Sequence, residues 1–319
     1  MNENQDSVMA GIVLYNSDYD RMIDCLSSLC RQVEQIIIID NSPSPLPPDN
    51  IETIETLYNS KYIFSVENLG MAGAMNKIME LAEEKRCAWV LTMNADSIVP
   101  SNMIETFRER FSDKTIGIIC PQIIDKRRKY MSADPNKENE YISMCITSGA
   151  CTRVKAWRQV GGFDTWLFVD LLDNDISKRM ILNGWKIYQI NSVILDQEFG
   201  EITAKSKRAE SFWLAVGRVL HNENFAKFSY RKIVRPNRVY YTCRNIVYLN
   251  KKYKNYGGIG YRENYNCKTF AGFLICFVLP SILRAAKKGE LVKAVIKGFQ
   301  DGKSKNVEPW KSSKIRNKI

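Results

Sequence analysis

Three carboxylates fall within six residues of this chain, at Asp170, Asp173 and Asp175, and Arg179 follows about one helical turn later. The pattern predicts a helix that starts near Asp173 and ends at Gly184, a residue type favoured just after a helix. Acidic side chains in a first helical turn complement the helix dipole, but three carboxylates are more than capping requires. Carboxylates can move protons or hold cations that prefer oxygen ligands, so this segment is a candidate for chemistry.

A second set of candidates consists of polar clusters that follow short apolar runs. The clusters are Tyr15-Asn16, Asp40-Asn41, Asn68-Leu69-Gly70 and Asn94-Ala95-Asp96-Ser97. The run before Asp40 contains four consecutive isoleucines, and a strand that is apolar on both faces suits the centre of a parallel sheet. Ligands of parallel α/β sheets bind outside the carboxyl ends of the strands. Four clusters in register therefore indicate one shared site.

The elements that would position these residues alternate between strands and helices. Expected strands span residues 8–15, 35–40, 62–66, 87–93, 116–120 and 141–147, and expected helices span 18–30, 72–84 and 101–111, the last capped by Ser101. Such alternation predicts an α/β fold with a mostly parallel central sheet flanked by helices. Beyond Gly200 the chain becomes helical and basic, which predicts a C-terminal extension of a different kind.

Several chemistries are disfavoured by composition. The nine cysteines are odd in number and no two have Cys-x-x-Cys spacing, which argues against a disulfide framework and a closed zinc site. His221 is the single histidine and has no neighbouring Ser or Cys pattern that would suggest nucleophilic catalysis. Residues 1–7 lack the basic and apolar regions of a signal peptide. Free cysteines and the absent signal favour a reducing, cytoplasmic location.

Charge divides the 319 residues into two unequal parts. Residues 1–199 carry 20 basic and 28 acidic side chains, whereas residues 200–319 carry 26 basic and 7 acidic ones. The basic part should prefer a polyanion, either nucleic acid or an anionic membrane surface. It also contains fifteen uncharged residues at 269–283, fewer than the roughly 20 of a spanning helix. This run is either a buried core helix or an in-plane or re-entrant membrane segment, and the following stretch 291–299 is amphipathic.

Motifs spread over almost the whole chain match one family. The carriers are the opening strand at 10–16, Ile39-Asp40-Asn41-Ser42, the segment from Glu67 to Asn76, Asn94-Ala95-Asp96-Ser97, Gly161-Gly162-Phe163-Asp164, the element Asp173-x-Asp175-x-x-x-Arg179, the stretch 238–245 and Gly298-Phe299-Gln300-Asp301-Gly302. In this order and spacing the sequence resembles family 2 glycosyltransferases of the GT-A fold, most closely their bacterial rhamnosyltransferase-like branch. The resemblance implies transfer of a sugar from a nucleoside diphosphate-sugar to an acceptor hydroxyl.

The resemblance also implies roles for the candidate residues. Asp173 would be the general base, and one base on the face opposite the leaving group implies a single displacement with inversion. Asp170, Asp175 and Arg179 would orient the base or the acceptor, although Asp175 and Arg179 also fit a surface ion pair. Trp166 would stack on a sugar or pack in the core. The donor would be bound by residues from all four strand-end clusters and by one residue of the helix at 72–84: Tyr15, Asn16, Asp40, Asn41, Asn68, Gly70, Asn94, Asp96 and, from the helix, Asn76.

Two departures from the family pattern concern the metal. Asn94 replaces the first carboxylate of the Asp-x-Asp motif, and Gln197 occupies the position where the family often has a metal-binding histidine. Asp96, Gln197 and phosphate oxygens could still hold Mg²⁺ or Mn²⁺, which favour oxygen ligands. The expectation is a divalent metal that is bound more weakly than is usual for the family.

The resulting prediction is a catalytic domain over residues 1–200 and a basic helical region over 201–319. The nucleotide-sugar half of the domain would be about 1–97 and the acceptor half about 98–200. The best donor is dTDP-L-rhamnose and the expected acceptor a lipid-linked glycan of a capsule or O-antigen. The enzyme would lie on the inner face of the plasma membrane. Alternatives are transfer of galactofuranose, galactose or glucose, a degenerate sugar-nucleotide-binding protein, and a nucleic-acid-binding protein, which no recognised motif supports.

Overall fold

The structure is a computed structural model that describes residues 4–311. Its centre is an eight-stranded sheet with the order β3-β2-β1-β4-β7-β5-β8-β6. The strands are β1 (Asn4–Leu14), β2 (Gln35–Asp40), β3 (Ser60–Phe64), β4 (Cys87–Asn94), β5 (Ile116–Ile124), β6 (Glu140–Ile142), β7 (Ala150–Arg153) and β8 (Lys186–Asp196). The first four are mutually parallel, as are β5 and β8, whereas β6 and β7 pair antiparallel with their neighbours. The expected mostly parallel α/β sheet is confirmed.

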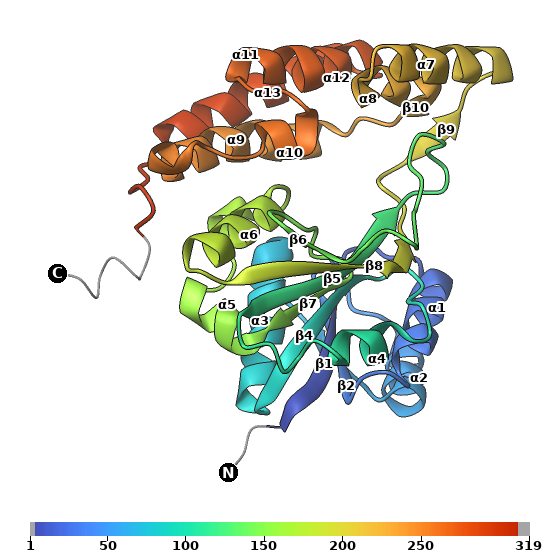
Figure 1. Cartoon of the computed structure of the whole chain (residues 1–319), viewed down its shortest axis with the longest axis vertical. Coiled ribbons are helices and arrows are strands. Elements are labelled where there is room, and N and C mark those ends of the chain that lie inside the picture. The colour runs from blue at the N-terminus through green and yellow to red at the C-terminus, as the bar shows by residue number, and fades with distance from the viewer. Residues whose placement is uncertain (1–3, 312–319) are drawn as a thin grey trace.

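Helices cover both faces of this sheet (Figure 1). One face packs against α1 (Tyr19–Leu29), α2 (Pro48–Tyr58) and α4 (Met103–Arg108), and the other against α3 (Gly70–Glu84), α5 (Val154–Val160) and α6 (Leu172–Leu182). The isoleucines of β2 explain how one strand serves both cores. Ile36 and Ile38 belong to the first, and Ile37 and Ile39 to the second, because successive side chains point to opposite faces.

Several expected boundaries were wrong. The helix expected from Ser101 is the shorter α4, whose N-cap is Asn102, because Met103 N–H donates to Pro100 O (3.1 Å) in a turn instead of to a serine side chain. The strand expected at 62–66 is β3, two residues earlier, in register with β2. The strand expected at 141–147 shrinks to β6, which is an edge strand with a single partner, β8.

The rest of the described chain forms a helical layer above the sheet (Figure 1). It contains α7 (Lys207–Val219), α8 (Glu223–Ala226), α9 (Pro236–Lys252), α10 (Tyr261–Tyr265), α11 (Phe270–Phe273), α12 (Leu279–Arg284) and α13 (Lys288–Ser304), with a two-stranded sheet of β9 (Ile202–Ala204) and β10 (Tyr230–Lys232). The expected helical extension is therefore confirmed, while the domain boundary near Gly200 stays a prediction.

Two glycines allow the closest helix contact of this layer. A Cβ on Gly298 or Gly302 of α13 would collide with the backbone carbonyl oxygens of Tyr240 or Arg244 on α9. Glycine at both positions lets the two backbones approach closely. The contact matters for function because α9 also touches the loop that precedes α6, as described below.

Candidate functional site

The four predicted polar clusters come together at one edge of the sheet. Because β3, β2, β1 and β4 are adjacent and parallel, their carboxyl ends lie side by side. In the register, Asp40 pairs with Leu14 on one side and with Phe64 on the other, and Asn94 pairs with Val13. The residues that follow each strand therefore border the same region, as expected from the sequence.

A recess of about 160 Å³ opens between the ends of β1 and β2. Its lining includes Asn16, Asp40 and Ser42. Asp40 is buried, and its Oδ1 accepts from Ser42 N–H (2.9 Å) while its Oδ2 accepts from the Tyr62 hydroxyl (2.6 Å). Each carboxylate oxygen has two acceptor sites, so Asp40 keeps capacity for a further donor. Tyr15 beside the recess is 57% exposed, which leaves its ring available for a planar group.

The next loop is shaped by Asn41 and Asn68. Asn41 Nδ2 donates to Gly70 O (3.1 Å), and its Oδ1 accepts from Leu69 N–H (3.2 Å). Asn68 Oδ1 accepts from Gly70 N–H (2.8 Å). Gly70 has φ +66°, and a Cβ there would strike the ring of Phe168, so glycine is required for both conformation and space. Asn41 thus positions the loop and is not itself free to bind a ligand with both ends of its amide.

Asn76 differs from its expected role as a donor contact. Its Oδ1 accepts from Phe163 N–H (2.7 Å) and from Trp157 Nε1–H (3.1 Å), and its Nδ2 donates to Phe163 O (2.9 Å). The whole amide is therefore used to anchor the Gly161-Gly162-Phe163 turn to α3. The reason is tertiary: α3 and α5 pack on the same face of the sheet, which brings the turn after α5 onto Asn76.

Asp96 lies beyond β4 in an accessible, charged setting. Its side chain is 40% exposed, and Arg21 reaches both its Oδ2 (3.9 Å) and its backbone carbonyl oxygen (3.3 Å). The same guanidinium contacts Glu198 (3.4 Å), which follows Gln197. Arg21 therefore contacts both the segment after β4 and the segment after β8, which lie close together here. Asn94 is the last residue of β4, and its N–H donates to Ser148 Oγ (3.0 Å).

Gln197 is the unusual member of this group. The residue is 5% exposed, and its Oε1 has no hydrogen-bond partner within residues 4–311. A buried amide oxygen without a donor costs free energy of roughly 1–3 kcal/mol, so a cation or donor at this point would be stabilised. Among the described residues no group of three or more His, Cys, Asp and Glu side chains could hold a metal. Any cation here would rely on few protein ligands.

Asp173 sits at the start of α6 and remains partly exposed. Its Oδ1 accepts from Thr147 N–H (2.9 Å). Desolvation raises the pKa of this carboxyl to about 6, the charge of Asp170 adds to the rise, and Thr147 and Arg238 oppose it. A carboxylate with such a pKa can accept a proton near neutral pH far better than an ordinary aspartate. A partly exposed carboxylate with a raised pKa is suited to act as a base.

Asp175 and Arg179 form a buried pair, so the surface ion pair considered from the sequence is wrong. Asp175 is 0% and Arg179 2% exposed, and Arg179 Nε donates to Asp175 Oδ2 (2.9 Å). The other oxygen of Asp175 accepts from Lys252 (2.7 Å) and Tyr253 (2.7 Å) on and after α9. Lys252 also contacts Asp164 (2.6 Å). Neither Asp175 nor Arg179 can reach a ligand in solvent, because both are sealed inside the contact between α6 and α9.

The loop before α6 is held in a strained shape by α9. Phe168, Asp170 and Leu171 all have φ near +61°, a left-handed conformation that costs free energy for residues other than glycine. Asn245 Nδ2 lies within 2.9 Å of the carbonyl oxygens of Leu167, Val169 and Asp170. Asp170 is further fixed by Arg238, whose Nε donates to its Oδ2 (2.8 Å). The C-terminal layer therefore shapes the loop that carries Asp173.

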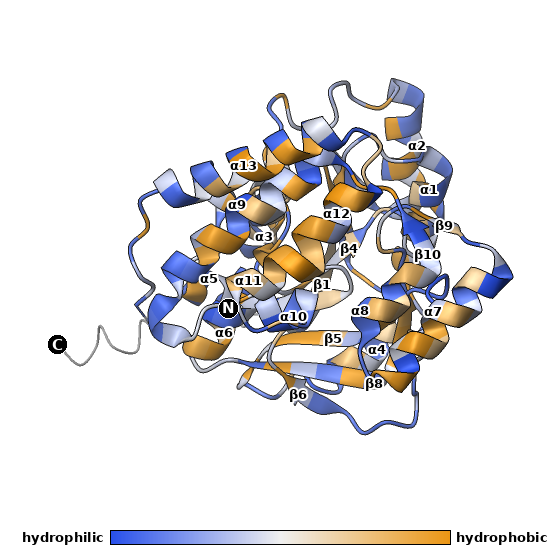
Figure 2. Ribbon diagram, turned by 90° about the horizontal axis from the view of Figure 1, so that it is seen from above, coloured by the Kyte–Doolittle hydropathy of each residue, from blue (hydrophilic) through white to orange (hydrophobic). Residues whose placement is uncertain are grey.

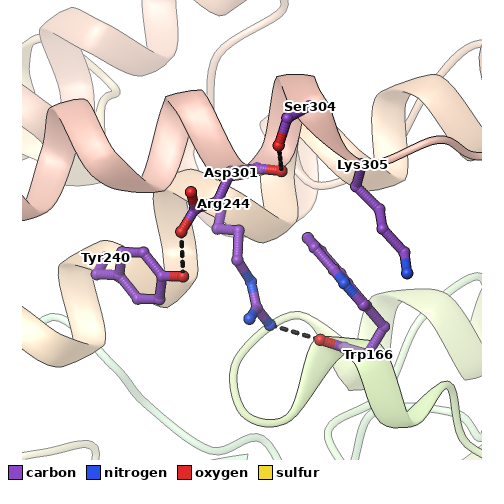
Figure 3. A pocket seen from close by; sticks show the side chains of 6 residues that line it. All are labelled: Trp166, Tyr240, Arg244, Asp301, Ser304 and Lys305. Carbon is purple, nitrogen blue, oxygen red and sulfur yellow. Dashed lines mark hydrogen bonds between the residues drawn. The ribbon is translucent and has the colours of Figure 1, made fainter.

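Trp166 is packed against this layer and not held ready for a sugar. Its ring stacks on Tyr248, with ring centres 4.3 Å apart, and the guanidinium carbon of Arg244 lies 4.1 Å from the ring centre. Arg244 also donates to Trp166 O (2.5 Å) (Figure 3). These residues line a recess of about 260 Å³ together with Tyr240 and Asp301, whose side chains hydrogen bond (2.6 Å).

We predict that Asn245→Ala lowers kcat by about tenfold to a hundredfold, because small displacements of a catalytic group have effects of that size. Affinity for a nucleotide should stay unchanged, since Asn245 Nδ2 contacts only the loop that carries Asp173 and its Oδ1 accepts from the neighbouring Arg244. Steady-state kinetics with nucleotide binding measured separately would check this. Asn237→Ala, an exposed position on the same helix, is the control. Equal effects of the two variants would contradict a positioning role for Asn245.

Sequence reasoning missed Arg21, Asn245 and Lys252 as parts of the site. Arg21 belongs to the amphipathic pattern of α1, where a charged residue on the outer face carries no special signal. Asn245 and Lys252 lie seven residues apart, which places them on one side of α9 (two helical turns) and is a signal that was available. Their partners, however, lie more than 70 residues earlier in the chain.

Comparisons with known proteins agree with this geometry. Residues 10–160 match the family model described as glycosyl transferase family 2. The chain is 22% identical over 220 residues to the dTDP-rhamnosyl transferase RfbF of Shigella flexneri, an alignment that covers 64% of this chain and 72% of that protein.

Two solved structures are similar in fold. The crystal structure of GalNAc-T7 with UDP, GalNAc and Mn²⁺ has a TM-score of 0.52 at 14% identity, covering 86% of this chain and 57% of that one. The crystal structure of S. aureus TarS 1–349 has a TM-score of 0.50 at 12% identity, covering 93% and 89% respectively. This chain thus spans little more than half the length of the GalNAc-T7 chain.

Proposed function

We propose that this chain, which is a family 2 glycosyltransferase with the GT-A fold, transfers L-rhamnose from dTDP-L-rhamnose to a hydroxyl of a lipid-linked glycan. The observation that supports this reaction is Asp173, a partly exposed carboxylate whose pKa is raised to about 6 by desolvation. The similarity to a dTDP-rhamnosyl transferase supports the donor. Synthesis of a bacterial surface polysaccharide is the matching role.

The residues divide the work between the two sides of the site. The recess lined by Asn16 and Asp40 would receive the nucleoside, with Tyr15 against the base. Asp173 would take the proton from the acceptor hydroxyl as its oxygen attacks the anomeric carbon, while the bond to the diphosphate breaks. Because attack and departure occur on opposite faces, the configuration at the anomeric carbon is inverted. Asn245 and Arg238 would act through Asp170 and its loop by holding Asp173 in place.

Asp96 and Gln197 fit a divalent cation that prefers oxygen ligands. Asp96 offers a carboxylate whose ion pair with Arg21 is long (3.9 Å). Gln197 offers a buried amide oxygen that has no hydrogen-bond partner in the described chain. These two residues would hold Mg²⁺ or Mn²⁺, with phosphate oxygens completing the set. When bound, the cation would neutralise charge on the leaving diphosphate. With only two protein ligands, weak binding follows.

We predict that EDTA lowers turnover and that added Mn²⁺ restores it. Gln197→Leu should raise the Mn²⁺ concentration needed for half-saturation about tenfold, the equivalent of ~1.4 kcal/mol, without lowering the melting temperature, since it removes an unpaired buried oxygen. Mn²⁺ binding followed by electron paramagnetic resonance in the presence of dTDP gives a readout independent of activity. Gln197→Glu should bind Mn²⁺ more tightly. Full activity in EDTA would refute the metal requirement.

The donor is tested by a panel of nucleotide-sugars. dTDP-L-rhamnose should give the largest thermal shift and the fastest donor hydrolysis. UDP-galactofuranose, UDP-galactose and UDP-glucose are the comparisons, and a stronger response to any of them would replace rhamnose as the donor sugar.

We also propose that the helical layer attaches the enzyme to the cytoplasmic face of the plasma membrane. The stretch Tyr261–Arg284 is long and apolar enough to cross a membrane by length and composition, yet only 17% of its apolar 18-residue window is buried. The chain leaves the helix at 266–269, so the uninterrupted part, residues 270–284, measures about 22 Å at 1.5 Å per residue. That is shorter than the ~30 Å hydrocarbon core, which favours an in-plane orientation.

An apolar face supports this attachment. We use that name for Ile275, Leu279 and Leu283, which are 65%, 51% and 64% exposed and are spaced four residues apart. Figure 2, seen from above, shows orange segments on α11 and α12 and further ones on α7 and α13. Residues 200–319 carry 26 basic and 7 acidic side chains, and basic residues near an anionic leaflet contribute about 1 kcal/mol each.

We predict that replacing all three residues of the apolar face by serine weakens binding to anionic vesicles by more than about tenfold. Each large aliphatic side chain gains ~1.5–3 kcal/mol when it leaves water, so the loss of three should be visible in a sedimentation assay. Leu57→Ser on α2, where the leucine is 65% exposed, is the control. Unchanged sedimentation of the triple variant would count against membrane attachment through this face.

A further inference from the structure

Five basic side chains gather where β9, β10, α8 and α12 meet. They are Lys205, Lys227, Arg231, Lys232 and Arg284, and we call them the basic cluster. Phe228 lies among three of them. The Arg284 guanidinium carbon is 4.6 Å from the centre of the Phe228 ring, Lys205 Nζ donates to Phe228 O (2.8 Å), and Arg284 Nη2 lies 3.5 Å from Lys227 O.

The antiparallel pairing of β9 and β10 adds the other two members. Lys232 is opposite Ile202 and Arg231 is opposite Thr203 on the strand next to Lys205, and their side chains point to opposite faces of this strand pair. The charge of Arg231 acts on Lys205, and that of Arg284 acts on Lys232. Within residues 4–311 none of the five has an ion pair with a carboxylate. The cluster is therefore an uncompensated concentration of positive charge.

Two lysines of the cluster have lowered pKa values, chiefly through desolvation and also through neighbouring cations. Desolvation lowers the pKa of Lys232 to about 8, and the charges of Arg128, Arg238 and Arg284 lower it further, against Asp170. Desolvation also lowers the pKa of Lys205, with Arg284 and Arg231 contributing. Assembling these charges without an anion is unfavourable. A ligand carrying two or more negative charges would remove the repulsion.

The cluster connects the membrane side of the layer with the catalytic side. Arg284 ends α12, one residue after Leu283 of the apolar face. At the other end, Lys232 interacts electrostatically with Arg238 and Asp170, the pair that adjoins Asp173. A ligand bound here would thus have one part near the bilayer surface and another near the base.

We propose that the basic cluster binds the phosphate or diphosphate of a polyprenyl-linked acceptor, and so presents the sugar attached to it to Asp173. This inference rests on the proposed function, because it names where the anionic group of the lipid-linked acceptor is held. The long apolar chain would remain in the bilayer under the apolar face. Several cations around one anion provide the charge-assisted hydrogen bonds that phosphate oxygens accept.

The donor diphosphate has a different place. The nucleoside recess lies between β1 and β2, and the charged residues near Asp96 are Arg21 and, through Glu198, Arg127. Lys232 lies near Arg238 and Asp170 on the side of Asp173, and also near Arg128, which shares Asp125 with Arg127. If the cluster holds the acceptor, loss of its charge should weaken acceptor binding and leave dTDP affinity unchanged.

The test compares three kinds of phosphatidylcholine vesicle. One contains a long-chain polyprenyl diphosphate, one the matching polyprenol, and one phosphatidylglycerol at the same total charge as the diphosphate. The wild-type chain should bind the first at least about tenfold more tightly than the other two. The double variant Lys232→Gln/Arg284→Gln should lose this preference. Lys61→Gln/Lys114→Gln, two exposed lysines of the sheet domain, removes the same charge and should keep it.

Three results would overturn the proposal. Equal binding of phosphatidylglycerol vesicles would reduce the cluster to a general anionic-surface contact. Equal behaviour of the two double variants would show that the cluster does not bind the diphosphate. A loss of dTDP affinity in Lys232→Gln/Arg284→Gln, measured by thermal shift, would assign the cluster to the donor. The vesicle assay contains no donor, so its failure is distinguishable from failure of the proposed transfer reaction in the nucleotide-sugar panel.

Discussion

Asp173→Asn should reduce turnover by roughly 10²–10⁴-fold, the usual contribution of a positioned base. The substitution keeps size and shape, and the Asn oxygen can still accept from Thr147 N–H, so the loop should be preserved. Donor affinity should stay at the wild-type value, because Asp173 lies on the acceptor side. Turnover with the best donor of the panel, together with thermal shift on the nucleotide, measures both quantities.

The pH dependence gives this prediction a second readout. The wild-type rate should fall about tenfold per pH unit below pH 6, because protonation of Asp173, whose pKa is about 6, removes the base. This acidic limb should be absent from any residual activity of Asp173→Asn. Asp24→Asn, an exposed carboxylate of α1, should leave the limb in place. A wild-type profile that is flat from pH 5 to 7 would contradict the assignment of Asp173 as base.

Asp173→Asn should raise the stability of the protein although it lowers turnover. A carboxyl whose folded pKa lies above its unfolded value of about 3.9 favours folding less as pH rises between the two values. Above pH 6 the ionised Asp173 therefore destabilises the fold, and Asp173→Asn should unfold at a higher urea concentration than the wild type. A variant that is both more stable and less active would mark a site where stability is given up for function.

Arg179→Leu should destabilise the protein by about 3–5 kcal/mol, the typical effect of removing one partner from a buried ion pair. It leaves Asp175 buried with Lys252 and Tyr253 but without the guanidinium that also donates to Val160 O (2.7 Å). The free energy of unfolding from urea denaturation measures the loss. The double variant Asp175→Leu/Arg179→Leu should recover part of it, because Lys252 keeps Asp164.

The contribution of Asp175 to stability depends on pH in the opposite sense to that of Asp173. Burial alone would raise the pKa of Asp175, but the charges of Arg179 and Lys252 outweigh it and lower the pKa. The stabilisation is therefore complete above the unfolded pKa of about 3.9 and is lost as pH falls through the lower folded pKa. The difference between wild type and Arg179→Leu should stay constant from pH 5 to 9. A loss smaller than about 1 kcal/mol would mean that water reaches the pair.

Much of the sheet and its flanking helices was predictable because their signals are local. Alternating apolar runs and helical patterns predicted the parallel sheet, and the rule that ligands gather at strand ends selected four clusters that the sheet brings to one edge. Asp40 and Asn16 accordingly line one recess, and Asp173 begins α6 as expected. The errors at Ser101 and at 141–147 came from a turn and from an edge position, which a single stretch of sequence does not reveal.

The roles of several site residues required the folded chain. From the sequence, Asp175 and Arg179 fit a solvated pair as well as an orienting one, and burial under α9 decided that they are structural. Asn76 looked like a donor ligand, yet its amide is used by a turn 87 residues away. The role of each of these residues depends on which surfaces pack against it. Packing between segments far apart in the chain produces no hydrophobic periodicity that the sequence would reveal.

By itself, the sequence determined the fold class, the identity of the strand-end clusters and the uneven distribution of charge, because hydrophobic periodicity and composition act locally. Only the tertiary structure decided what the basic half does beside the site. It shows α9 holding the strained loop of Asp170 through Asn245, and it brings Arg284 and Lys205 to the segment Lys227-Phe228, which precedes Arg231 and Lys232. Both depend on contacts between residues far apart in the chain, whose energies exist only once the layers have packed.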